Sequence, residues 1–140
     1  MDAITLMKDD HKRIKTLLNG ASEAENRQER EVLLATIRSE MAAHEVMEEQ
    51  IFYPALKPHE DARDVVMEGY EEHHIADILM DELMEVASDS DVWKAKMKVL
   101  KESVEHHIEE EEGEMFKKAK RVLERDELED LGRRMEALKG

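Results

Sequence analysis

The sequence contains no cysteine, only two prolines and five glycines, and aromatic residues make up just 4% of its 140 residues. The absence of cysteine excludes disulfides and thiolate metal sites, so a bound metal must use nitrogen and oxygen ligands. Scarce proline and glycine favour long helices over turn-rich folds. No apolar run approaches the roughly 18 residues of a membrane-spanning helix. We therefore expect long helices, none of which crosses a membrane.

Positive charge is also scarce, because 36 Asp and Glu outnumber 21 Lys and Arg and give a formal net charge of −15. Nucleic acids and anionic membranes are bound by basic surfaces, so this balance argues against both as partners. The first residues, Met1 to Ile4, lack the basic and apolar regions of a signal peptide. We expect a cytoplasmic protein whose single domain spans residues 1–140 and buries its own core.

Apolar residues recur at intervals of three and four, which is the period of an amphipathic helix. This spacing predicts helices at about residues 1–24, 28–56, 61–87, 91–123 and 126–138. Asn26, Pro58 and the run from Ser88 to Asp91 mark the turns between the first four, and Pro54 should kink or finish the second helix. The predicted fold is all-α: an up-down-up-down four-helix bundle over about residues 2–123, with a short fifth C-terminal helix across one end.

Two stretches of the sequence share one pattern. His44 is followed four residues later by Glu48, and His107 is followed four residues later by Glu111, each with a second glutamate directly after it. On a helix, this spacing places the imidazole and the carboxylate on one face, one turn apart. Such a pair can hold one metal ion, or one ion of two, and two copies can close a site from opposite sides of a bundle.

Four histidines are predicted to share one level of the bundle. They are His11, His44, His73 and His107. In an up-down bundle, residues at one level are equally far from the turn between them, and the midpoint of each consecutive pair falls on or beside a predicted turn. Each histidine lies on an apolar stripe that carries no Lys or Arg at this level. Because an unpaired buried carboxylate costs several kcal/mol, a metal is the simplest compensating charge for Glu48 and Glu111.

Neighbouring polar residues need to be sorted by the face they occupy. His73 and His107 are predicted to face inward, because the positions one and two turns away from each are more apolar than those around His74 and His106. Two glutamates, Glu109 and Glu112, are expected on a solvated face, and three others are expected at the surface or beside the ligands: Glu45, Glu49 and Glu110.

Two tyrosines are candidates for the open side of the site. Tyr70 lies three residues before His73 on the same face, where it packs and where its hydroxyl could reach an open metal position. Tyr53 is the weaker candidate.

Four histidines and two glutamates favour a pair of first-row transition ions, since a single ion rarely uses six protein ligands. Two central carboxylates, Glu48 and Glu111, can bridge the ions, with imidazoles as terminal ligands and positions left open for a small molecule. Calcium and magnesium avoid imidazole, whereas zinc fits the ligand types.

The order of these motifs resembles the hemerythrin-like HHE cation-binding family over about residues 3–120. The resemblance rests on an early histidine, His-x-x-x-Glu-Glu ending in Phe-Tyr-Pro, a Glu-His pair, and a second His-x-x-x-Glu-Glu ending in an aromatic residue. It implies a four-helix bundle with two iron ions bridged by oxide or hydroxide, with zinc or manganese as substitutes. The implied ligands are His11, His44, Glu48, His73, His107 and Glu111.

The chain departs from the family pattern at two positions. The oxygen-carrying hemerythrins have a fifth histidine where this chain has Asp77, and Lys117 stands in place of an expected proline. The resemblance therefore implies the family in general and not the oxygen carriers in particular.

The sequence leaves several functions open. The first is a diiron protein that binds dioxygen, peroxide or nitric oxide for sensing, storage or detoxification. The second is a diiron enzyme that decomposes peroxide or nitric oxide. An iron or redox sensor and a metal-free helical interaction module are further alternatives, and the sequence identifies no protein partner.

Overall fold

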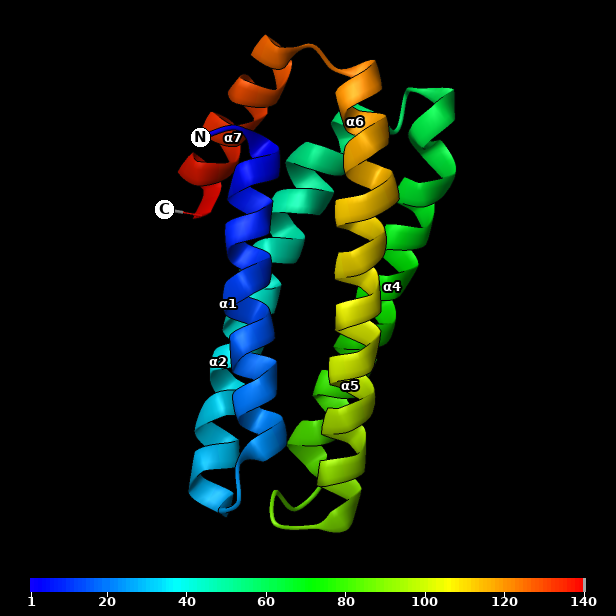
Figure 1. The fold of residues 1–140 in the computed structure, drawn as a ribbon. Coiled ribbons are helices and arrows are strands. Elements are labelled where there is room, and N and C mark those ends of the chain that lie inside the picture. The colour runs from blue at the N-terminus through cyan, green and yellow to red at the C-terminus, as the bar shows by residue number, and fades with distance from the viewer. Residues whose placement is uncertain (140) are drawn as a thin grey trace.

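The computed structural model describes residues 1–139, and Gly140, where the predicted domain ends, lies outside the described residues. Four long helical arms run alternately up and down, and a shorter helix lies across one end (Figure 1). The arms begin with α1 (Ala3–Glu23), α2 (Arg27–Met47), α4 (Glu60–Glu85) and α5 (Asp91–Glu110), and the shorter helix is α7 (Arg125–Lys139). The predicted all-α bundle with a fifth C-terminal helix is confirmed.

Side-chain caps fix where three of the arms begin. Asp2 accepts a hydrogen bond from the Thr5 amide at 2.8 Å, and Asn26 accepts one from Glu29 at 2.9 Å. Ser90 caps α5 in the same way. These caps satisfy amide groups that a helix leaves free in its first turn, so the helices start at the turn residues that the sequence indicates.

The second and fourth arms each contain one π-helical turn. In the second arm, η1 (Glu48–Phe52) and the short α3 (Tyr53–Leu56) follow α2; in the fourth, η2 (Glu111–Met115) and α6 (Phe116–Val122) follow α5. Pro54 is the second residue after the first π turn, and the helix continues past it to Leu56 before ending. Since the other arm makes the same turn before Lys117, proline is not the cause of the π turn.

The buried apolar side chains form two clusters with a polar layer between them. The cluster at the end near α7 includes Met7, Phe52 and Phe116, and the cluster toward the other end includes Ile14 and Trp93. On every arm, the histidines and glutamates of the predicted site fall between residues of one cluster and residues of the other. The bundle therefore holds its ionisable residues in the middle, shielded from solvent at both ends.

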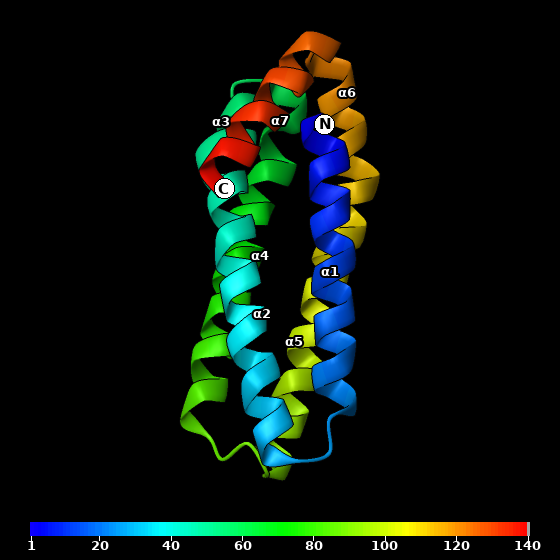
Figure 2. The same cartoon turned by 90° about the vertical axis from the view of Figure 1, so that its left-hand side faces the viewer.

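Helix α7 completes the first cluster. It lies beside the N-terminal end of α1, where both Figure 1 and Figure 2 place it, and it buries Leu128, Leu131 and Met135. At Gly132 the helix touches the backbone of Met1 and Asp2, because a Cβ atom there would overlap both residues. Among residues 1–139, no helix combines the length and apolar character needed to span a lipid bilayer.

Gly132→Ala should loosen α7 from the N-terminus. The added methyl would overlap backbone atoms that cannot rotate away, so we expect the free energy of unfolding to fall by about 1–3 kcal/mol. Gly20→Ala is the matched control, because its Cβ would lie 3.7 Å from Leu33, an ordinary contact, and should leave stability unchanged or raise it. Urea unfolding of both variants tests this expectation, and equal stability of the Gly132 variant and the parent would contradict it.

Candidate metal centre

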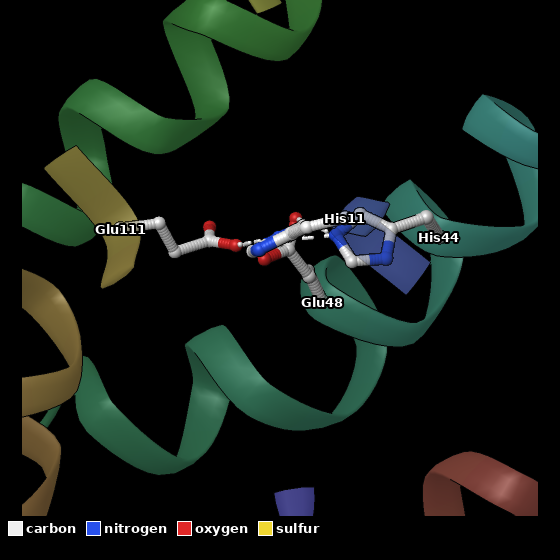
Figure 3. A group of neighbouring side chains, drawn as sticks. All are labelled: His11, His44, Glu48 and Glu111. Atoms are coloured by element: carbon white, nitrogen blue, oxygen red, sulfur yellow. Dashed lines mark hydrogen bonds and ion pairs between the residues drawn. The ribbon is translucent and has the colours of Figure 1, made fainter. Parts of the chain in front are cut away.

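The six predicted ligands meet in the polar layer. Helix α1 contributes His11, α4 contributes His73, and the arms that contain the π turns contribute His44 with Glu48 and His107 with Glu111. None of the six is more than 7% exposed. Figure 3 shows four of them, with the two glutamates reaching toward the imidazoles from different arms. The inward placement predicted for His73 and His107 agrees with the structure, in which His74 and His106 are exposed.

The Nε2 atom of every one of these histidines faces a glutamate. His11 Nε2 lies 2.9 Å from Glu111 Oε1, and His73 Nε2 lies 2.9 Å from Glu48 Oε1. The other two imidazoles face the glutamate one turn further along their own arms, at 3.3 Å for His44 and 3.2 Å for His107. Four nitrogen atoms and two carboxylates thus converge on one small volume.

The Nδ1 atom of every histidine is held by a second carboxylate on a neighbouring arm. His11 pairs with Glu112 at 2.6 Å, and His73 pairs with Glu49 at 2.7 Å. His44 pairs with Asp10 at 3.0 Å, and His107 pairs with Glu72 at 2.7 Å. With Nδ1–H donating to a carboxylate, the Nε2 lone pair is free to bind a metal, which is how proteins commonly orient histidine ligands.

The four outer carboxylates close a ring around the bundle. Asp10 joins α1 to α2, Glu49 joins η1 to α4, Glu72 joins α4 to α5, and Glu112 joins η2 back to α1. Glu112, predicted on a solvated face, is partly exposed, but its carboxylate also accepts a hydrogen bond from buried His11. The prediction for Glu49 allowed a place beside the ligands, and the structure puts it there.

Sequence reasoning missed the roles of Asp10 and Glu72. A signal for them was present, since each outer carboxylate is the immediate sequence neighbour of a predicted ligand. Adjacent helical residues point about 100° apart, so the neighbour of an inward ligand reaches sideways to the next helix. Asp10 is 2% exposed and also pairs with Arg13 and with Lys139 of α7, which ties the fifth helix to the site.

The charges of the layer shift the pKa values of its members strongly. Burial and the charge of Glu111 raise the pKa of Glu48, but the charge of His44 and the nearby His107 imidazole outweigh them and lower it to about 2. Burial lowers the pKa of His73, but its hydrogen bond with Glu48 and the charge of Glu48 raise it to about 9. Without a metal, the layer is therefore stabilised by protonated imidazoles such as His73 that face ionised glutamates such as Glu48.

Unpartnered atoms in this layer fit a metal. Among residues 1–139, the buried atoms His44 Nε2, His107 Nε2 and Glu48 Oε2 have no hydrogen-bond partner, although each faces the centre. The donor atoms fall into two groups of metal-binding size: His11, His44, Glu48 and Glu111 form one, and Glu48, His73 and His107 form the other. Imidazole nitrogen and carboxylate oxygen are the donors that iron, zinc and manganese accept, so the residues fit two such ions.

The tyrosine that reaches the centre is Tyr53 and not Tyr70, which reverses the predicted ranking. Tyr53 is fully buried, and its hydroxyl donates a hydrogen bond to Glu111 Oε2 at 3.0 Å. Tyr70 is only half-buried and packs edge-on against the Tyr53 ring, with 5.1 Å between centroids. Burial and the charges of Glu48 and Glu111 raise the pKa of Tyr53 well above its ordinary value, so this phenol keeps its proton.

A small cavity of about 10 Å³ lies beside His73 and His107. Its other lining residues include the apolar side chains of Met41, Ala76 and Val104. The volume suits about one water-sized molecule. The cavity therefore lies beside the smaller donor group, which consists of Glu48, His73 and His107.

Comparison with known proteins agrees with this geometry. The family profile described as the Hemerythrin HHE cation binding domain matches residues 2–119. The chain belongs to this family. A solved crystal structure of a hemerythrin HHE cation binding domain-containing protein from Mycobacterium kansasii is similar at 28% sequence identity and a TM-score of 0.88, covering 99% of this chain and 85% of that one. No curated protein sequence matched the chain.

The family assignment confirms the resemblance that the sequence indicated. A cation-binding description agrees with a buried cluster of histidine and glutamate side chains. In this HHE domain the cluster lies at the level where the repeated His-x-x-x-Glu-Glu motif predicts it.

The pKa shifts predict how the stability of the metal-free HHE domain changes with pH. Because the pKa of His73 rises from 6.5 to about 9, its stabilisation is complete below pH 6.5 and is lost as pH rises through 9. Glu48 contributes in the opposite direction: its stabilisation is present above pH 4.5 and is lost as pH falls toward 2. Urea unfolding in the presence of a chelator should therefore show a maximum at mildly acidic pH and a decline by pH 9.

Glu45 should make the stability of the folded chain fall more steeply as the pH rises. Burial raises its pKa and the charge of His73 lowers it, but Asp77 adds to the rise and the pKa reaches about 8. The folded chain then holds a proton that the unfolded chain releases between pH 4.5 and 8, so stability falls across that range. Glu45→Gln should flatten the decline, whereas Glu68→Gln at an exposed position should not. A profile that rises between pH 5 and 9 would disprove the assignment of these shifts.

Proposed function

We propose that this HHE domain holds two iron ions and binds a small ligand, such as dioxygen, peroxide or nitric oxide, at one of them. The observation that carries the proposal is the set of four imidazoles, each held at Nδ1, whose Nε2 atoms converge on two buried glutamates. Zinc or manganese would fit the same donors. Bound iron would supply redox chemistry and a coordination position for the ligand.

The two ion positions differ in the number of protein donors. One is surrounded by His11, His44, Glu48 and Glu111, whereas the other has Glu48, His73 and His107. The position with fewer donors leaves more room for an exogenous ligand, and the cavity of about 10 Å³ lies beside it. A cavity that suits about one water-sized molecule favours a small ligand.

The surrounding residues keep water away from this position. Apolar clusters lie on both sides of the layer, and the cavity walls carry Met41, Ala76 and Val104. Excluding water strengthens the electrostatic interactions in the site and slows loss of a bound ligand to solvent.

Iron content provides the first test. We expect the purified protein from iron-replete cells to contain two iron ions per chain and to show visible charge-transfer absorption after exposure to air. Glu48→Gln should lower the content to one ion or fewer, because Glu48 belongs to both donor groups. His74→Gln, which changes an exposed histidine next to His73, should keep two. Elemental analysis and absorption spectra measure both, and an iron-free protein that also fails to take up iron on reconstitution would refute the proposal.

Consumption of peroxide or nitric oxide is the second candidate function, and Tyr53 favours it. A catalyst of this kind benefits from a hydrogen-bond donor beside the reacting oxygen, and the Tyr53 hydroxyl is a buried donor at Glu111. Phe116 occupies the equivalent place after Glu111, where it stacks on His11 at 6.2 Å between centroids without a hydroxyl. The bundle therefore tolerates phenylalanine at this level.

Tyr53→Phe should separate binding from turnover. We expect it to keep the iron content and the fold but to lower the rate of oxygen evolution from hydrogen peroxide by about 10²-fold, because one hydrogen-bond donor is lost. Tyr70→Phe, the neighbouring ring, should retain the rate. A stoichiometric consumption of peroxide by the unchanged protein would contradict the enzymatic function. Normal turnover by the Tyr53 variant would contradict it as well, and either result leaves ligand binding as the proposed function.

A further inference from the structure

A cleft opens to solvent between the second arm and α4. It has a volume of about 480 Å³, and its lining includes Glu45, Glu49 and Asp77. A second cleft, of about 420 Å³, is lined by Glu49 and Asp77 as well and reaches His73. The two clefts thus share two carboxylates, and one of the clefts reaches a ligand of the centre.

Glu45 has an unsatisfied atom in this place. The residue is 7% exposed, and its Oε2 atom has no hydrogen-bond partner among residues 1–139. Donor atoms of Glu45, Glu49 and His73 lie within 4.8 Å of one another, which is the spacing of ligands around a single ion. A buried carboxyl group with an unpartnered oxygen is costly, and a cation that displaces its proton would satisfy that oxygen.

The surroundings of these carboxylates favour a cation. The two clefts also include Glu71 and Asp81, whereas the only Lys or Arg side chain in their linings is Arg38, which pairs with Asp81 at 3.1 Å. Converging negative charge in a cleft raises the local concentration of cations and their association rate.

We propose that Glu45 and Glu49, with Asp77 from the lining of both clefts, form an outer site for a divalent cation, ferrous iron, through which the ion reaches the buried centre. This inference rests on the proposed function, since the centre is the destination. The ligands of the outer site are carboxylates, whereas the centre offers four imidazoles, which bind iron more strongly than carboxylate oxygens alone. An ion would therefore move inward, and Glu49 lies on the path because it contacts both the cleft and His73 Nδ1.

The kinetics of metal uptake test the outer site. Co²⁺ is the probe, because its visible absorption reports coordination by imidazole without any reaction with oxygen substrates. Stopped-flow mixing of metal-free protein with Co²⁺ should give a rate that saturates with Co²⁺ concentration, as expected for binding at the surface before transfer. The double variant Glu45→Gln, Asp77→Asn should slow uptake by about tenfold or more while the final absorption stays the same.

A matched control separates the outer site from general charge. Glu102→Gln with Asp64→Asn removes the same net charge at exposed positions away from the clefts, and it should leave uptake close to that of the unchanged protein. Excess Mg²⁺, which binds carboxylates and avoids imidazole, should slow uptake by the unchanged protein but not by the Glu45 and Asp77 variant, relative to NaCl of equal ionic strength.

The outcomes distinguish the two proposals. If the unchanged protein binds no Co²⁺ at its imidazoles, the proposed function fails. If it binds normally and the cleft variant takes up Co²⁺ at the same rate, only the outer site is disproved. A variant with an unchanged rate but a lower final absorption would also disprove it, since the residues would then belong to the centre. Should the double variant fold poorly by circular dichroism, Asp77→Asn alone, at an exposed position, carries the same expectation.

Discussion

The burial of Glu48 and Glu111 is the constraint on which the rest of the structure depends. Both carboxylates lie in the middle of the bundle with at most 1% of their surface exposed. Such groups must be matched by positive charge, and the layer supplies it through imidazoles that can carry protons or bind cations. Because the buried ionisable side chains are collected in one layer, the apolar side chains divide into two clusters that close the bundle above and below it.

The ring of four outer carboxylates orients the histidines that face Glu48 and Glu111. Each carboxylate joins two neighbouring arms through a histidine Nδ1 atom, so the orientation of a ligand on one helix depends on an acid from the next. The ring also reflects an internal repeat, in which an acid-His pair is followed by His-x-x-x-Glu-Glu in each half of the chain. The hydrogen bonds that join the four arms are thus the same ones that orient the histidine ligands.

The helices and the inward histidines could be predicted from the sequence because both follow a period of 3.6 residues. The outer carboxylates could not, since an acid such as Glu112 beside a ligand looks solvent-facing until the neighbouring helix is in place. The ranking of Tyr53 below Tyr70 failed for a different reason. In a regular α-helix Tyr53 would point about 140° away from Glu48, five residues earlier. The π turn restores it to that face, where its amide bonds to the Glu48 carbonyl.

The two halves of the internal repeat differ in the residues that surround the metal ligands. Tyr53 and Phe116 occupy equivalent places, yet only Tyr53 brings a hydroxyl, and it bonds to Glu111 while Glu48 Oε2 has no hydrogen-bond partner among residues 1–139. The small cavity and the acidic cleft both lie against His73, whereas on the other side Phe116 stacks on His11 and α7 reaches Asp10. A symmetric framework thus has one closed side and one open side, and exchange of ions and ligands is expected through the open one.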